Sequence, residues 1–139
     1  MQRSDDSRKK RILMLVSTIS VSLVLALIVL FAAISPPSPE RVVSNMLESI
    51  AQQDQEALES YVTGSAMEDL TAAAQDLDSP WRLYWKNGQD LFAEFRTVKA
   101  EVKGDTALVS VYYGPGQYQQ EDFLLRREDR RWKVYDMDR

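Results

Sequence analysis

Residues 97–113 read TVKAEVKGDTALVSVYY and carry the clearest structural signal in the chain. Apolar and polar side chains alternate before and after Gly104-Asp105, a pair that is typical of a turn. An alternation with a period of two is typical of strands that have one covered face. The stretch therefore predicts a β-hairpin with strands over residues 97–102 and 107–113.

Two more strands are predicted after this hairpin, over residues 117–127 and 131–137. A Gly-Pro-Gly turn at 114–116 separates the first of them from the hairpin, and a charged turn at 128–130 separates the two strands. Apolar residues again fall at alternate positions in each strand. The chain thus ends in a predicted antiparallel meander, whose apolar face needs a covering layer.

The helices that could cover it are predicted over residues 39–78, where apolar residues recur at helical spacing. The first helix has Ser38 as its N-cap and Pro39 at its first position. The second follows Asp54, and the third begins with a capping box at 65–68. The predicted fold class is α+β, with about three helices packed on a curved antiparallel sheet of four or five strands.

Residues 81–95 leave two interpretations open. The Asn87-Gly88 pair is typical of a hairpin turn, which favours a strand that ends there. A further helical segment is the alternative. We favour the strand.

These segments together resemble the cone-shaped nuclear-transport-factor-two-like superfamily, in particular its small bacterial exported members of unassigned function. The resemblance is carried by QQDQEALESYV at 52–62, KGDTALVSVYY at 103–113 and DFLLRREDRRWKVYDM at 122–137. It covers residues 39–139 and implies a cone-like domain. The superfamily includes enzymes such as ketosteroid isomerase and scytalone dehydratase, whose chemistry lies inside the cone.

A long apolar run precedes this domain. It extends from Ile12 to Ile34, twenty-three positions without a charge. At ~1.5 Å per residue, a helix of this length crosses the ~30 Å hydrocarbon core of a bilayer. A cleaved secretory signal is the competing interpretation, but its apolar region has only ~7–15 residues. We therefore predict an uncleaved transmembrane signal anchor over residues 12–34.

The charges that flank this run predict its orientation. The basic residues directly before it are Arg8, Lys9, Lys10 and Arg11. The first basic residue after it is Arg41. By the positive-inside rule, residues 1–11 form a cytoplasmic basic tail and residues 39–139 lie outside the cytoplasm. A Pro/Ser linker over residues 35–38 acts as a short, stiff spacer between them.

Composition narrows the function classes. Residues 1–11 carry a net charge of +3 and the residues after the apolar run carry −7, which excludes nucleic acid as the expected partner and favours anionic lipid for the tail. The chain has no cysteine and no histidine, so we expect no disulfide, no metal and no cofactor. The commonest general base is also missing.

A tyrosine beside a carboxyl group could still transfer protons. The candidates are Tyr84, Tyr112 or Tyr113 with Asp90 or Glu94. None of them matches a catalytic position of the superfamily, so we predict that the protein is not an enzyme.

Aromatic residues are the other feature that indicates a function, because they line both apolar pockets and protein interfaces. The predicted ligand or partner contacts are Trp81, Tyr84, Trp85 and Tyr112. The alternative is that these rings fill the core. We interpret Trp132 as a core residue, and the arginine pairs at 126–127 and 130–131 as a solvated hairpin whose charges are balanced by the acidic residues between them.

The sequence thus predicts a single-pass protein of the bacterial cytoplasmic membrane. Its exported domain would be a non-catalytic interaction or assembly module of the cell envelope, and it also resembles the inner-membrane assembly factors of type IV secretion machines. The expected partners are the lipid bilayer and another envelope protein or a second copy of the chain. The alternative is a binder of a small apolar ligand in the cone cavity, with weak or no enzymatic activity.

Overall fold

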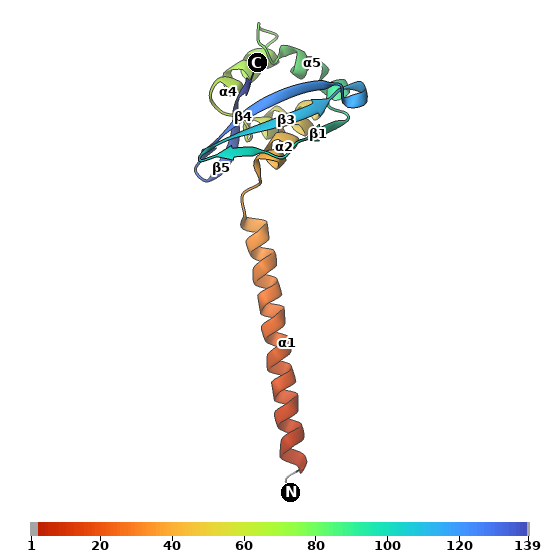
Figure 1. Cartoon of the computed structure of the whole chain (residues 1–139), viewed down its shortest axis with the longest axis vertical. Coiled ribbons are helices and arrows are strands. Elements are labelled where there is room, and N and C mark those ends of the chain that lie inside the picture. Colours follow the sequence, from red (N-terminus) through yellow and green to blue (C-terminus); the bar gives the residue numbers. More distant parts are fainter. Residues whose placement is uncertain (1–2, 139) are drawn as a thin grey trace. The chain divides into compact units, whose positions relative to one another are not determined.

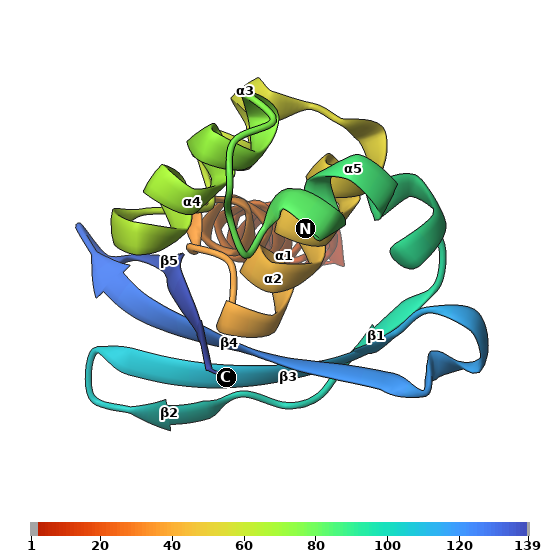
Figure 2. The ribbon, with the colours of Figure 1, turned by 90° about the horizontal axis from the view of Figure 1, so that it is seen from above.

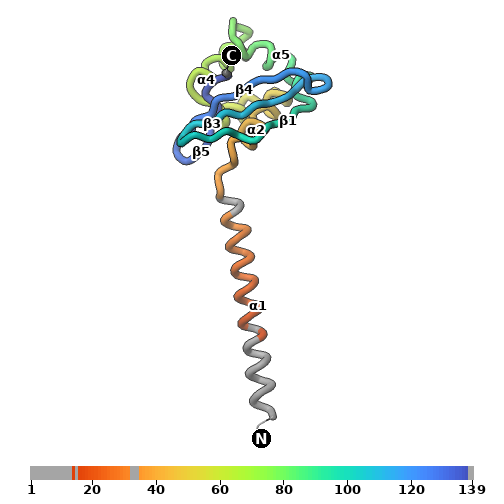
Figure 3. The backbone as a smooth tube through the Cα atoms, viewed as in Figure 1, coloured from red at the N-terminus to blue at the C-terminus, as the bar shows by residue number. Residues whose placement is uncertain are grey.

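A computed structural model describes the backbone of residues 3–138 and the side chains of Met14, residues 16–31 and residues 35–137. Figure 3 draws the residues of uncertain placement in grey. The chain divides into two compact units, residues 1–35 and residues 36–139, and each is described by itself.

The first unit is one helix, α1 (Arg3–Ile34), shown in Figure 1. Two of its hydroxyl groups, on Thr18 and Ser20, donate to the carbonyl oxygens four residues earlier, at 2.7 and 2.9 Å. Within the described residues, no helix has both the length and the hydropathy needed to cross a membrane. The side chains of the predicted span ends and topology determinants lie outside the described residues: Ile12, Ile34, Arg8, Lys9, Lys10 and Arg11.

The second unit has helices packed on an antiparallel sheet, which confirms the α+β class. Its helices are α2 (Pro39–Gln52), α3 (Gln55–Glu59), α4 (Gly64–Ala74) and α5 (Arg82–Leu91). Its strands are β1 (Phe95–Thr97), β2 (Glu101–Lys103), β3 (Thr106–Tyr113), β4 (Gln119–Glu128) and β5 (Arg131–Asp138). A short 3₁₀ helix, η1 (Pro115–Gln117), precedes β4. In Figure 2 the helices of this unit lie on one face of the sheet.

The sheet order is β1-β3-β4-β5, and β2 also pairs with β3. The predicted hairpin is therefore confirmed, but its first strand is interrupted between β1 and β2. The interruption coincides with a contact to α2, because the backbone N–H of Ala100 donates to Oε1 of Glu40 at 2.7 Å. The last two predicted strands are also confirmed as β4 and β5.

Two of the three predicted helix starts are confirmed. Ser38 caps α2 by accepting from the N–H of Arg41, and Asp54 caps α3 by accepting from the N–H of Ala57 at 3.0 Å. The predicted capping box of the third helix is wrong. α4 begins at Gly64, and the hydroxyl of Ser65 instead donates to the carbonyl of Tyr135 on β5 at 2.6 Å.

The strand favoured for residues 81–95 is also wrong, because most of that segment forms α5. The second unit therefore has a fourth helix among its described residues, one more than predicted. Trp81, Tyr84, Trp85 and Gly88 follow the i, i+3, i+4, i+7 pattern of one helix face. Asn87 departs from helical geometry, with φ −113° and ψ 15°, but the helix continues beyond it.

The core lies between the helices and the covered face of the sheet. Its largest fully buried side chains come from helices, strands and the segments between them: Trp81, Phe123, Met46, Leu47, Ile50, Leu58, Leu70, Leu125, Val42, Val43, Val62 and Val109. Trp132 and Val134 are buried on β5, as the alternation predicts. The free edge of β5 is partly covered, since the N–H of Thr63 donates to the carbonyl of Val134 at 2.8 Å.

The Glu40 contact predicts a measurable pH dependence. The hydrogen bond from the N–H of Ala100 lowers the pKa of the Glu40 carboxyl group below its ordinary value. A lowered pKa in the folded state stabilises the fold above the unfolded pKa of about 4.3, and this stabilisation is lost as the pH falls through the folded pKa. We expect Glu40→Gln to flatten the fall in melting temperature between about pH 5 and pH 3.

Glu48, which is exposed on the same helix, supplies the control. Glu48→Gln should keep the wild-type slope of melting temperature against pH. Equal slopes for Glu40→Gln and the wild type would contradict a folded-state role for the Glu40 carboxylate.

Candidate functional site

The structure brings together only some of the aromatic residues predicted to contact a ligand or partner. Trp81 is 1% exposed, and its ring centroid lies 6.4 Å from that of Tyr84 in an edge-to-face arrangement. Trp85 is half-buried and packs against the same core. Tyr112 belongs to the opposite face of β3, where the guanidinium carbon of Arg96 lies 4.8 Å from its ring centroid.

Trp81 and Tyr84 belong to a larger group, which we call the aromatic cluster. Its members come from α5, from the residues directly before and after that helix, and from β3 and β4: Trp81, Tyr84, Phe92, Tyr113 and Phe123. Neighbouring ring centroids are 5.2–6.4 Å apart, within the usual range for favourable aromatic pairs. These rings fill the space between α5 and the sheet.

Two hydrogen bonds are made by the hydroxyl of Tyr84 in this cluster. The hydroxyl of Tyr84 donates to Oε2 of Glu121 and accepts from the hydroxyl of Tyr113 at 3.3 Å. Burial, and then the hydrogen bond to Glu121, raises the pKa of Tyr84 well above its ordinary value. The phenol therefore stays protonated at ordinary pH and acts as a hydrogen-bond donor rather than a base.

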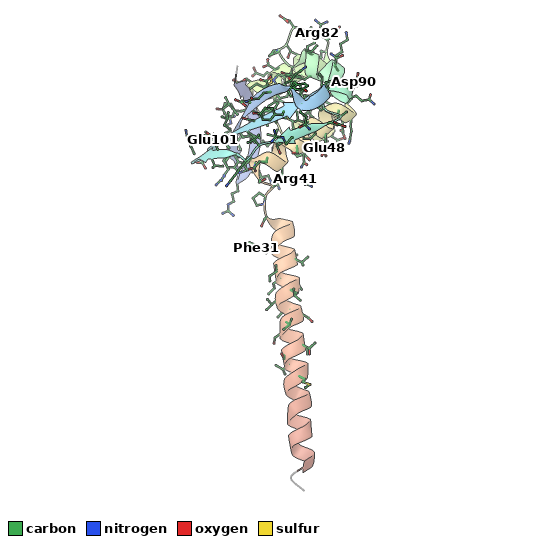
Figure 4. The ribbon with its side chains drawn as sticks, turned by 45° about the vertical axis from the view of Figure 1, so that its right-hand side comes forward. Phe31, Arg41, Glu48, Arg82, Asp90 and Glu101 are labelled. Carbon is green, nitrogen blue, oxygen red and sulfur yellow. The ribbon has the colours of Figure 1, made fainter. Side chains whose placement is uncertain are left out.

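The acidic partner of Tyr84 was not among the sequence candidates. Asp90 is exposed and points away from the sheet in Figure 4, and Glu94 is exposed as well. Glu121 lies on β4 two residues before Phe123, so the alternation of the strand places it on the covered face. Its position two residues before Phe123 and four before Leu125, on the covered side of the strand, was the signal that could have identified it.

The contact between Tyr84 and Glu121 should be structural. Tyr84→Phe leaves a half-buried carboxylate without this donor, and we expect a loss of about 1–2 kcal/mol in the free energy of unfolding. Chemical denaturation measures it. Tyr118→Phe is the control, because Tyr118 is exposed and its replacement should have no effect. A Tyr84→Phe variant as stable as the control would contradict the contact.

The cluster also contains an unpartnered donor. Nε1 of Trp81 is buried and has no hydrogen-bond acceptor among the described atoms. A buried N–H without an acceptor is unfavourable and needs an explanation. A bound ligand or water with an acceptor atom would satisfy it.

A second feature is a groove beside the linker, which we call the linker groove. It has a volume of about 690 Å³ and is lined by Pro36, Pro37, Ser38, Pro39, Val102, Arg127, Arg130 and Trp132. The guanidinium carbon of Arg127 lies 4.5 Å from the ring centroid of Trp132. The charges of the hairpin at 126–131 are therefore only partly balanced within it. Nε of Arg126 pairs with Oε1 of Glu128 at 2.6 Å, whereas Arg127 and Arg130 line the groove.

A third feature is the face of the sheet opposite the helices, which we call the open sheet face (Figure 2). It carries a shallow hollow of about 240 Å³ lined by Glu101, Lys103, Thr106, Ala107, Leu108, Leu124 and Tyr135. Leu108 and Leu124 are register partners on β3 and β4 and are only half-buried. Apolar side chains thus remain partly accessible on this face.

The described residues contain no group of three or more acidic side chains placed to hold a metal ion. No family model matches the chain, and no curated protein or solved structure is significantly similar to it.

Proposed function

We propose that this chain is a single-pass protein of the bacterial cytoplasmic membrane, and that residues 39–139 form a non-catalytic interaction or assembly module outside the cytoplasm. The observation that carries the anchor is the exposure of large apolar side chains around α1. These residues are Met14, Val16, Ile19, Val21, Leu23, Val24, Leu25, Leu27, Ile28, Val29, Leu30 and Phe31. A helix that is apolar on all sides needs a lipid or protein environment. The complete uncharged run, from Ile12 to Ile34, is long enough for the lipid.

The open sheet face supports the interaction role. Half-buried Leu108, Leu124 and Tyr135 surround a hollow there, and the helices of the domain lie on the opposite face (Figure 2). An accessible apolar patch with a charged rim is typical of a protein interface. The proposed partner is another envelope protein or a second copy of the chain. Membership of the nuclear-transport-factor-two-like superfamily stays a prediction.

A reporter fusion tests the topology. An enzyme that is active only outside the cytoplasm, fused after Arg139, should be active. Because the anchor is proposed to be uncleaved, the mature protein should keep its basic tail. Activity of a cytoplasm-only reporter at the same position, or a mature amino terminus near Pro36, would contradict the signal anchor.

Site-specific photo-crosslinking tests the interface. A photoreactive amino acid at Leu124 should give a crosslinked product in intact membranes, and a product of twice 15.9 kDa identifies a second copy of the chain. The matched control is Leu83, a leucine on α5 that is 63% exposed and lies outside the open sheet face. Equal crosslinking at both positions would remove the support for an interface on the sheet.

A ligand-binding function is the second candidate, favoured by the unpartnered Nε1 of Trp81. Native mass spectrometry of the full chain after mild detergent extraction should then show a retained small molecule. Trp81→Phe keeps an aromatic ring but removes the donor, so it should release the ligand. A chain that carries no ligand before the substitution excludes this candidate for the extracted protein.

A further inference from the structure

We propose that the linker groove binds the phosphate group of a membrane phospholipid and thereby holds the exported domain against the bilayer surface. This inference rests on the proposed membrane anchor. It assigns a role to Arg127 and Arg130, which the proposed interaction through the open sheet face does not use.

The linker groove is close in the chain to the end of the proposed membrane span. Pro36 lines the groove and lies two residues after Ile34, the last residue of the proposed span. Since one residue extends the chain by at most about 3.6 Å, the wall of the groove lies within about 7 Å of the end of the span. The prolines at 36, 37 and 39 stiffen this connection. Pro36, one wall of the groove, is therefore within reach of the lipid headgroups.

The linker groove carries positive charge on an otherwise acidic domain. Residues after the apolar run carry a net −7, so most of the domain surface is repelled by an anionic membrane. The groove is an exception, because neither Arg127 nor Arg130 forms an ion pair with any described residue. Of the two acidic residues in the adjacent turn, Glu128 and Asp129, Glu128 is paired with Arg126 and also accepts from the hydroxyl of Thr63. Two arginine side chains without an ion-pair partner among the described residues thus line the groove.

The side chains that line the groove combine arginine with tryptophan and apolar residues. Arg127 lies over the ring of Trp132, and a guanidinium stacked by its face keeps N–H groups at its edges for phosphate oxygens. Tryptophan is enriched where a membrane meets water. Val102, which is 51% exposed, and the three prolines supply apolar walls. A phospholipid offers the matching chemistry, a phosphate next to an apolar glycerol and acyl region.

The backbone of the β4–β5 turn has two residues with left-handed φ values. Asp129 and Arg130 have φ values of 48° and 67°, in the left-handed region that two-residue hairpin turns require. Glycine is the favoured residue at the second position, and arginine there is strained. Strained residues cluster at functional sites. Arg130, one of these residues, also lines the linker groove.

The experiment measures the distance between the groove and lipid headgroups in the full chain. Since the chain has no cysteine, Glu101→Cys places a unique fluorophore on an exposed residue next to Val102. Tyr118→Cys places one just before β4, about 20 Å away along the strand direction, because Glu101 lies level with Leu124 in the sheet. Each protein is reconstituted into phosphatidylglycerol-containing nanodiscs with a nitroxide quencher on the headgroups. We expect strong quenching at position 101 and weak quenching at 118.

Variants separate phosphate binding from general attraction and from folding. In the Glu101→Cys background, Arg127→Gln and Arg130→Gln should each weaken the headgroup contact about fivefold, the effect of one arginine at an anionic surface. Arg131→Gln removes the same charge next to the groove but does not line it, so it should have little effect. Arg130→Gly should lose the contact and yet raise the melting temperature, because it relieves the left-handed backbone.

Other outcomes overturn the proposal. Equal quenching at positions 101 and 118 would show that the groove does not face the headgroups. Equal losses for Arg131→Gln and the groove variants would show only a diffuse charge effect. Undiminished quenching in nanodiscs of a glycolipid without phosphate would exclude phosphate recognition. Extraction by alkaline carbonate is measured separately for every variant. A chain that leaves the membrane refutes both the anchor and this inference. A chain that is retained but shows no selective quenching refutes this inference alone.

Discussion

Replacing Trp81 with alanine should cost the domain about 3–5 kcal/mol of its free energy of unfolding, through lost burial and the cavity left behind. That is a large share of the roughly 5–15 kcal/mol that stabilises a domain of this size. The ring is 1% exposed and lies between α5 and β4, with centroids 6.4 Å from Tyr84 and 6.0 Å from Phe123. Circular dichroism of the full chain in detergent, at increasing temperature or urea, measures the loss.

Two further substitutions make this result interpretable. Trp85→Ala removes a half-buried ring from α5, the helix that follows Trp81, so we expect a smaller loss. Trp81→Phe keeps an aromatic ring and removes the unpartnered Nε1 donor, so it should retain more stability than alanine. A Trp81→Ala variant no less stable than Trp85→Ala would contradict a central packing role for Trp81 and return it to the candidate partner contacts.

From the sequence, Trp132 is interpreted as a core residue and Trp81 as a candidate ligand or partner contact. The alternation on β5 predicts that Trp132 points inward, and it is 7% exposed, so that interpretation is confirmed. The sequence placed Trp81 in an ambiguous segment where its ring could line a cavity mouth or a partner surface. Its burial could not be read from the local sequence, because one of its two aromatic neighbours, Phe123, lies on β4, about forty residues away.

The meander and two helix starts were predictable because their signals are local. Strand alternation around Gly104-Asp105 requires only neighbouring residues, and the caps Ser38 and Asp54 bond to residues three positions later. The predicted cap at Ser65 failed for a tertiary reason. Its hydroxyl donates to the carbonyl of Tyr135, a partner that no local pattern indicates.

The candidate sites were less predictable than the fold. Glu121 could have been identified from its place two residues before Phe123, on the covered side of the predicted strand. The linker groove could not, because it joins the prolines of the linker with Val102 and with the β4–β5 turn. These three segments are remote in sequence, and only the packing of the sheet brings them together.

The Asn87-Gly88 pair shows how a strong local signal is overridden. It is a favoured hairpin turn, yet Gly88 lies within α5 and is buried against α2. A Cβ atom added at Gly88 would lie 2.5 Å from Cγ2 and 2.9 Å from the carbonyl oxygen of Ile50. The glycine is therefore needed for the close approach of two helices, not for a turn.

Gly88→Ala should consequently destabilise the domain by about 3 kcal/mol, at the upper end of the usual effect of overpacking. The sign is informative, because alanine in place of a helical glycine ordinarily stabilises by about 1 kcal/mol. Here the clash includes a backbone atom of Ile50, which cannot move without displacing α2. Urea denaturation of the full chain in detergent measures the change.

Two comparisons complete this test. Gln89→Ala, at the next and exposed position of α5, should leave the stability unchanged or slightly higher. Ile50→Ala combined with Gly88→Ala should recover only part of the loss, because it removes the contact with Cγ2 but leaves the contact with the carbonyl oxygen. If Gly88→Ala alone were stabilising, α5 would not pack this closely on α2, and the helix would have to lie elsewhere on the sheet.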